Sequence, residues 1–201
     1  MSTLLPSATP APAAAPTPTP APSKPVQGET MVVKPDFGSV RYRVPGTTEF
    51  RDAAGAVSLP TGTIVDATKG GIVLASQVGG KVQQGTFSGG EFRVRQAKRT
   101  GMTQIVLTAE LDCGTTAGRA SRLATKKKRR HVWGKDDGGK YETHGRDSVA
   151  AVRGTKWLVT DTCAGTVVRV FEGAVAVRPK RGKGKTVLVR AGGRHFTPAR
   201  R

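Results

Sequence analysis

The residues of this 201-residue chain best suited to covalent chemistry are its two cysteines, Cys113 and Cys163. Each ends a strand-like run, residues 107–113 and 158–163, and a Gly or Ala-Gly pair that predicts a turn follows each one. Two cysteines at matching strand ends can be neighbours in space. The pattern therefore favours a disulfide over two buried free thiols, provided that the compartment is oxidising. Without C-x-x-C spacing they supply only half of a ligand set, so we expect no metal site.

The other reactive side chains form no recognisable catalytic motif. Gly182-Lys-Gly-Lys-Thr186 looks like the end of a phosphate-binding loop, but Pro179 stands where that motif needs its first glycine, and a strand-like run follows. These residues therefore predict a basic hairpin turn. The three histidines have no partner at metal or nucleophile spacing; they are His131, His144 and His195. We expect no catalytic residues, no cofactor and no enzymatic activity.

Basic residues are the second distinctive feature of the sequence. The chain has 33 Lys and Arg against 14 Asp and Glu, a formal net charge of +19. Sixteen of the 33 lie in two acid-free segments, residues 119–131 and 178–201. A local excess of positive charge can bind a polyanion, either nucleic acid or an anionic cell-wall polymer. The candidate residues for such a site are Lys126, Lys127, Lys128, Arg129 and Arg130.

A run of like charges is also typical of a solvated loop, and the sequence favours this interpretation over a dedicated nucleic-acid site. Apart from Phe196, the two basic segments contain no Phe, Tyr or Trp, so they lack rings on which bases could stack. No RNA-recognition, zinc-finger or helix-turn-helix pattern is present. We expect the basic loop at about residues 114–147.

The elements that position these residues begin after a compositionally different segment. Residues 1–27 hold Ala-Pro and Thr-Pro repeats and almost no charge, which predicts a disordered, extended linker. This linker is either a spacer or a tail without a role. The first residues have neither the basic nor the apolar region of a signal peptide. No apolar run approaches the roughly 18 residues of a membrane helix, so we expect no membrane span.

Residues 28–201 predict a single all-β domain. Short runs of Val, Ile, Leu and Thr recur between glycines and prolines, and no window shows a helical apolar stripe. Asp136 and Asp137 precede two glycines and are typical of a turn. The strands could form a twisted β-solenoid or roll, or a two-sheet sandwich, and both stay open. The runs are 40–44, 63–67, 71–75, 91–95, 104–108, 156–160, 167–171, 174–177 and 186–190.

Three motifs stand out in the C-terminal third. They are Ala151-Val-Arg-Gly-Thr-Lys-Trp157, the G-x-V-x-V ending of residues 166–177, and residues 186–192, which end in Ala-Gly. Together they resemble the FecR domain family, and residues 38–74 fit its first half. The resemblance covers about residues 36 to 197. The basic stretch and the two cysteines are similar to the actinobacterial variant of this domain. The family motif residues are Val152, Arg153, Gly154, Thr155, Trp157, Gly173 and Gly192.

The resemblance implies a non-catalytic β module that binds or senses at the cell envelope, with a protein or cell-wall partner. It also implies an extracytoplasmic location, secreted or at the cell surface, although no signal peptide is visible. In the founding family this domain relays a receptor signal to a sigma factor, a mechanism that also uses an anti-sigma segment and a membrane helix. Only the fold, the location and a binding role carry over here. We expect Gly154 to allow a bulge in a buried strand and Trp157 to anchor the core.

Overall fold

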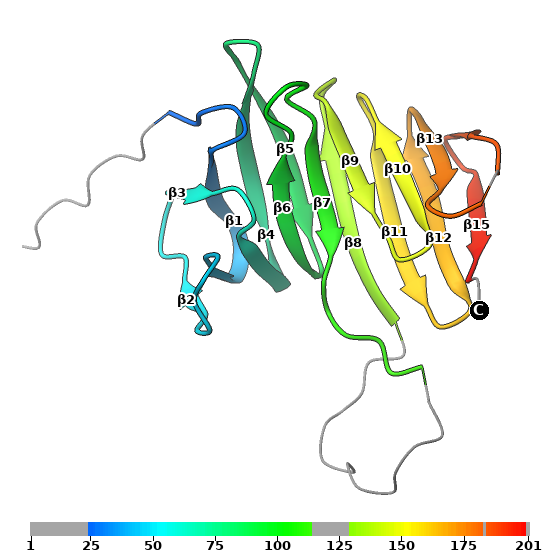
Figure 1. Ribbon diagram of the computed structural model, residues 1–201, viewed down its shortest axis with the longest axis horizontal. Helices are drawn as coiled ribbons and strands as arrows, with labels where there is room; N and C mark the ends of the chain where they lie inside the picture. The colour runs from blue at the N-terminus through cyan, green and yellow to red at the C-terminus, as the bar shows by residue number, and fades with distance from the viewer. Residues whose placement is uncertain (1–23, 114–128, 183, 200–201) are drawn as a thin grey trace, which may run out of the picture.

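The computed structural model describes residues 24–113, 129–182 and 184–199 (Figure 1). Most of the predicted linker and the residues Lys126, Lys127 and Lys128 lie outside the described residues. The last four residues of that predicted linker belong to the packed structure. Pro25 is buried, and Gln27 Nε2 donates a hydrogen bond to the carbonyl of Lys98 at 2.7 Å.

Fifteen β-strands form one sheet, and the described residues contain no helix, which confirms the all-β prediction. All strand pairs are antiparallel except β7 with β9. The strands are β1 (Thr30–Arg43), β2 (Arg51–Asp52), β3 (Val57–Pro60), β4 (Ile64–Val78), β5 (Lys81–Ser88), β6 (Glu91–Gln96), β7 (Thr103–Leu107), β8 (Arg129–Asp136), β9 (Tyr141–His144), β10 (Ser148–Val152), β11 (Lys156–Thr162), β12 (Gly165–Glu172), β13 (Ala174–Pro179), β14 (Val187–Arg190) and β15 (Arg194–Pro198).

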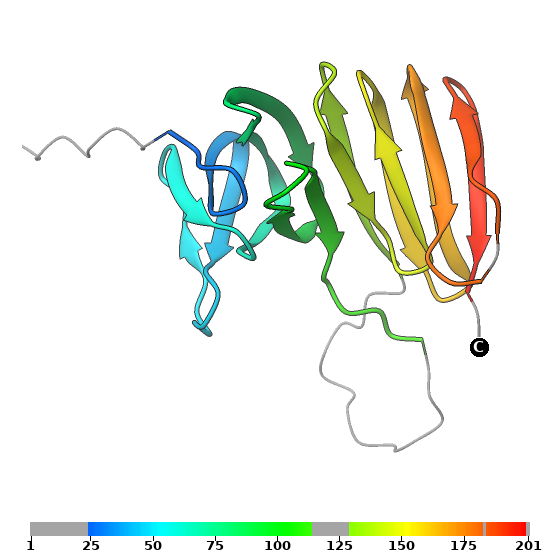
Figure 2. The same ribbon diagram turned by 45° about the horizontal axis from the view of Figure 1, so that its top comes forward.

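The sheet folds over on itself at β4. Residues 64–66 of this long strand pair with β6, and residues 71–78 pair with β5. The strands on the β6 side, in the order β14-β13-β10-β9-β7-β6, form a first layer. Those on the β5 side, in the order β5-β8-β11-β12-β15, form a second layer. The two layers overlap in the C-terminal half of the molecule, whereas β1 to β3 lie at the other end of the long axis (Figures 1 and 2).

The two ends of the sheet, β14 and β15, meet along a seam. The turn between them is bonded to β12, because Gly192 N donates to the carbonyl of Val170 at 2.9 Å and Val170 N donates to the carbonyl of Gly193 at 3.0 Å. The result is a nearly closed, flattened barrel. Of the two arrangements that the sequence left open, the structure is therefore one rolled sheet.

Aromatic rings fill the space between the layers. Trp157 of β11 and Phe87 of β5 face Tyr141 of β9 and Phe92 of β6, and all four side chains are almost completely buried. Phe87 lies 5.6 to 6.1 Å from the other three ring centroids. The indole N–H of Trp157 donates to Thr143 Oγ1 across the layers at 2.9 Å, which satisfies its polar group. Trp157 therefore anchors the core, as predicted.

The connection between β10 and β11 differs from the prediction. Gly154 is not part of a bulged strand but lies in this connection with φ of +64°, a conformation that favours glycine. The register shift occurs just after it, between Lys156 and Trp157. The buried Asp136 carboxylate accepts hydrogen bonds from the backbone N of Gly139 at 2.8 Å and of Gly154 at 3.1 Å. It stabilises its own turn, as predicted, and the neighbouring one.

Candidate functional site

Cys113 and Cys163 form a disulfide, with Cα atoms 5.2 Å apart. Cys163 lies in the turn between β11 and β12, and Cys113 follows β7. The bond ties two segments that are 50 residues apart in sequence. The disulfide prediction is confirmed and the free-thiol alternative is wrong. A structural disulfide is compatible with an oxidising, extracytoplasmic compartment.

Next to this disulfide, the buried carboxylate of Asp161 forms an ion pair with Arg130, one of the predicted polyanion-binding residues. Asp161 of β11 is fully buried, and a buried charge needs partners. Arg130 Nε donates to Asp161 Oδ2 at 2.9 Å, and the backbone N of Arg146 donates to both carboxylate oxygens at 2.8 Å. Thr166 Oγ1 donates to Asp161 Oδ1 at 2.5 Å. The charge of Arg130 is thus compensated inside the fold.

The two basic segments converge at this end of the barrel. Lys180, which follows β13, is close enough to Asp161, Asp147, Arg130 and Arg178 for their charges to act on its amine. Burial lowers the pKa of Lys180, and the two carboxylates partly offset this effect. The backbone N of Lys180 also donates to the carbonyl of Asp147 at 2.9 Å. The structure therefore joins Arg130 to the C-terminal segment through the Asp161 carboxylate that Arg130 and Lys180 share.

A different set of basic residues faces solvent on the outside of the second layer. Successive residues of a strand point to opposite sides of the sheet. Val132 of β8, Val159 of β11 and Val168 of β12 are buried, so the residues next to each valine point outward. Of the acids in these strands, Asp136 and Asp161 are buried, and only Glu172 at the end of β12 is exposed. We call the outward side the basic aromatic face. It carries Arg129, Trp133, Lys135, Lys156, Leu158, Arg169, Phe171, Arg194 and Phe196.

The rings and cations of the basic aromatic face lie close together. The Trp133 and Phe171 ring centroids are 4.9 Å apart, and the Arg169 guanidinium lies 5.9 Å from the Phe171 centroid. Phe171 is 41% exposed and Phe196 is 50% exposed. Within the described part of the chain, no acid forms an ion pair with any of the five cations of this face. A hollow of about 190 Å³ beside the indole is lined by Thr86, Ser88, Trp133, Gly134, Lys135 and Lys156.

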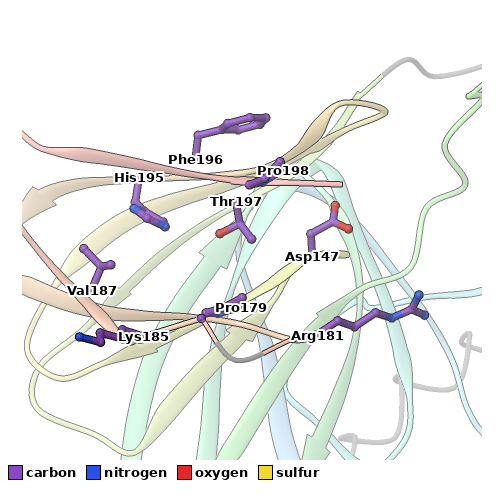
Figure 3. Close-up of a pocket in the computed structure, with 10 residues that line it drawn as sticks. Asp147, Pro179, Arg181, Lys185, Val187, His195, Phe196, Thr197 and Pro198 are labelled. Atoms are coloured by element: carbon purple, nitrogen blue, oxygen red, sulfur yellow. The ribbon is translucent and has the colours of Figure 1, made fainter. Parts of the chain in front are cut away.

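A second hollow, the seam pocket, lies where β14 and β15 separate (Figure 3). Its volume is about 270 Å³. The His195 and Thr197 side chains extend from β15 towards the residue 179–187 turn, and the Phe196 ring extends the opposite way (Figure 3). The turn connects the antiparallel strands β13 and β14, so the predicted basic hairpin is confirmed. The pocket is lined by Asp147, Pro179, Arg181, Gly184, Lys185, Val187, His195, Phe196, Thr197 and Pro198.

The seven residues that carry the resemblance lie in the core and in turns, and none of them belongs to the basic aromatic face. Val152, Thr155 and Trp157 are buried, while Arg153 is exposed. Gly173 has φ of +71°, and a Cβ there would approach the carbonyl oxygen of Gly154 at 2.6 Å. The remaining motif residue, Gly192, sits in the turn at the seam with φ of +80°. These contacts give the motif a structural role.

Two further observations bear on chemistry. His144 Nε2 lies 3.0 Å from Glu142 Oε2, and burial lowers the pKa of His144. In the described ranges, no three His, Cys, Asp or Glu side chains are grouped so as to hold a metal ion. Among the described residues there is also no helix with the length and apolar character needed to cross a membrane.

The fold and these surfaces define a disulfide-linked, all-β protein with a basic aromatic face on its second layer. Comparisons of the chain with protein-family models, with curated proteins and with solved structures find no match.

The candidate binding site predicted from the sequence was a run of adjacent cations, and it includes little of the basic aromatic face. Of the five candidate residues, only Arg129 lies on this face, because Arg130 points inward and the three lysines lie outside the described residues. Arg194 of this face belongs to the second basic segment, residues 178–201. The missed signal is a period of two. Basic and aromatic residues alternate in Arg129-x-His-x-Trp-x-Lys135, and again in Arg169-x-Phe171 and Arg194-x-Phe196. In a strand, this spacing places all of them on one side.

Proposed function

We propose that this chain is a non-catalytic binding module that works outside the cytoplasm, at the cell envelope, and that its ligand is an anionic envelope polymer. The observation that carries the proposal is the basic aromatic face. Five cations without an acidic partner in the described chain share it with three rings. A surface of one sign raises the local concentration of oppositely charged ligands.

The rings narrow the class of polymer. Trp133 and Phe171 form a joined apolar surface beside Lys135 and Lys156. A repeating unit that has both an anionic group and a sugar or polyol body can pair with the lysines and pack its C–H groups on the rings. The hollow beside Trp133 has room for part of such a unit. A wall polymer of sugar or glycerol phosphates has this chemistry.

Two observations support the location and the binding role. The disulfide suits an oxidising compartment. The resemblance to the FecR domain implies an envelope module that binds or senses rather than catalyses. Lys156, Arg169 and Phe171 lie within the segments that carry the resemblance, but none of the family motif residues belongs to the basic aromatic face.

The test is binding of the full chain to poly(glycerol phosphate), measured by calorimetry at several salt concentrations. The variant K135S/K156S/R169S removes three charges from the basic aromatic face. The matched control R51S/R95S/R99S removes three exposed charges from β2, β6 and the β6–β7 turn, none of which belongs to the second layer. We expect the face variant to bind at least about tenfold more weakly and the control to bind as the parent does, with affinity falling as salt rises.

Two outcomes would contradict the proposal. Equal losses in the two variants would mean that net charge alone drives binding, without a site. Tighter binding of a single-stranded oligonucleotide of the same charge, at the same salt concentration, would make nucleic acid the ligand instead.

A further inference from the structure

The seam pocket holds an unusual polar atom. In the described part of the chain, only two buried side-chain oxygen or nitrogen atoms lack a hydrogen-bond partner, Thr197 Oγ1 and Ser148 Oγ. Thr197 is 7% exposed and lines the pocket, whereas Ser148 does not line it. Ser148 is nevertheless close by, because it follows the lining residue Asp147 and pairs with the lining residue Pro179. Leaving a buried hydroxyl unpaired costs stability, so such atoms need an explanation.

The fold accounts for the opening beside Thr197. Thr197 pairs with Thr166 of β12 on one side. On its other side the barrel is not closed, because β14 and β15 share no ladder of hydrogen bonds. The Thr197 side chain points into this gap (Figure 3). A ligand in the seam pocket would therefore be the partner that the hydroxyl lacks.

The charges around the seam pocket favour an anion. Lys185 and Arg181 line it, and His195 adds an imidazole that can donate a hydrogen bond. Asp147 is the only acid in the lining, and Arg146 Nε already donates to its carboxylate at 3.0 Å. The rest of the wall includes Pro179, Val187 and Pro198, which suit a compact carbon body.

We propose that the seam pocket binds one small organic anion, a phosphate or carboxylate carried on a compact body. Thr197 Oγ1 donates to an oxygen of the anion, and Lys185 supplies the opposing charge. The volume of about 270 Å³ lies just below the usual range of small-molecule sites, about 300–1,000 Å³, so the ligand is small. Binding of the small anion in the seam pocket does not depend on polymer binding by the basic aromatic face.

The experiment is an NMR titration of the full chain with glycerol 3-phosphate, with lactate and with neutral glycerol. We expect saturable shifts of the amides of Asp147 and of residues 195–197 with one or both anions, and none with glycerol. Comparing the two anions identifies the preferred group. Saturable binding of glycerol at the same amides would overturn the anion assignment, and unchanged amides with all three probes would overturn the site.

Two variants that each remove a hydroxyl separate the ligand contact from stability. Thr197→Val and Ser148→Ala both remove an unpaired buried hydroxyl, so both are expected to raise the melting temperature. Only Thr197→Val is expected to weaken anion binding, by about tenfold. Lys185→Gln is expected to weaken it without changing the melting temperature. An unchanged affinity of Thr197→Val for the small anion would refute the site. The K135S/K156S/R169S variant is expected to bind the small anion as tightly as the parent does. Failure of this site is therefore distinct from failure of the proposed function.

Discussion

The two tryptophans show how differently the two sides of the second layer are built. Trp157 and Trp133 lie on neighbouring strands, and Trp133 pairs with Leu158, the residue after Trp157. Trp157 is fully buried, lies edge-on to the Phe87 ring and has its N–H bonded to Thr143 Oγ1. Trp133 lies on the outside, against the exposed Phe171. One step along a strand separates a core residue from a surface residue.

The polar residues of the two sides differ in the same way. On the inside, Asp136 and Asp161 are buried and hold several donors each. On the outside, the cations have no acidic partner among the described residues. Inside charges are arranged for stability, because a buried charge without a partner is costly. Outside charges are free to meet a ligand.

Exchanging each tryptophan for alanine gives the largest expected difference between the two sides. Trp157→Ala should lower the free energy of unfolding by about 3–5 kcal/mol, because it empties the centre of the core. Trp133→Ala should cost about 1 kcal/mol, the value of its ring contact, but should weaken binding to poly(glycerol phosphate). Urea unfolding measures the first effect. Similar losses of stability in the two variants would break the comparison.

The adjacent arginines Arg129 and Arg130 provide the next test. Arg130→Met leaves Asp161 buried without its cation and should cost about 3 kcal/mol. Arg129→Met removes an exposed charge and should change stability by less than about 0.5 kcal/mol. Thermal unfolding of both variants at one pH measures the difference. A stable Arg130→Met protein would show that the hydrogen bonds from Arg146 and Thr166 alone satisfy the carboxylate.

Removing the disulfide should have an effect of similar size. The C113S/C163S variant should lose about 2–4 kcal/mol, because the bond restricts a 50-residue segment of the unfolded chain. Unfolding in denaturant, with and without a thiol reductant, gives the value. The reductant should destabilise only the parent protein. An equal effect on the variant would assign the change to something other than Cys113–Cys163.

The smallest effect concerns pH. Burial lowers the pKa of His144, although its bond to Glu142 opposes this. The unfolded chain therefore binds a proton that the folded chain does not, and stability falls as pH drops from the ordinary histidine pKa through the lowered one. The slope cannot exceed about 1.4 kcal/mol per pH unit for one proton. His144→Gln should flatten the stability profile between about pH 7 and 5; an unchanged slope would assign it to another group.

Local patterns predicted nine runs that fall in eight of the fifteen strands, and they missed β2, β3, β5, β8, β9, β10 and β15. Strands β8 and β9 lie within the segment at about residues 114–147 that was predicted as a basic loop. Short β-branched runs between glycines define strands whatever they pair with. The role of Trp157 as a core residue also followed from sequence. The bulge expected at Gly154 was wrong, because a glycine with positive φ suits a turn as well as a bulge.

The amino-acid sequence alone determined the all-β class, the positions of most turns and the favoured disulfide, because each depends on residues close together in the chain or on residue type. Only the tertiary structure decided that the sheet rolls at β4, that Arg130 meets Asp161, and that β14 and β15 leave a pocket at the seam. These features depend on which distant strands become neighbours. Period-two spacing says that two residues share a side of a strand, but not whether that side faces the core or the solvent.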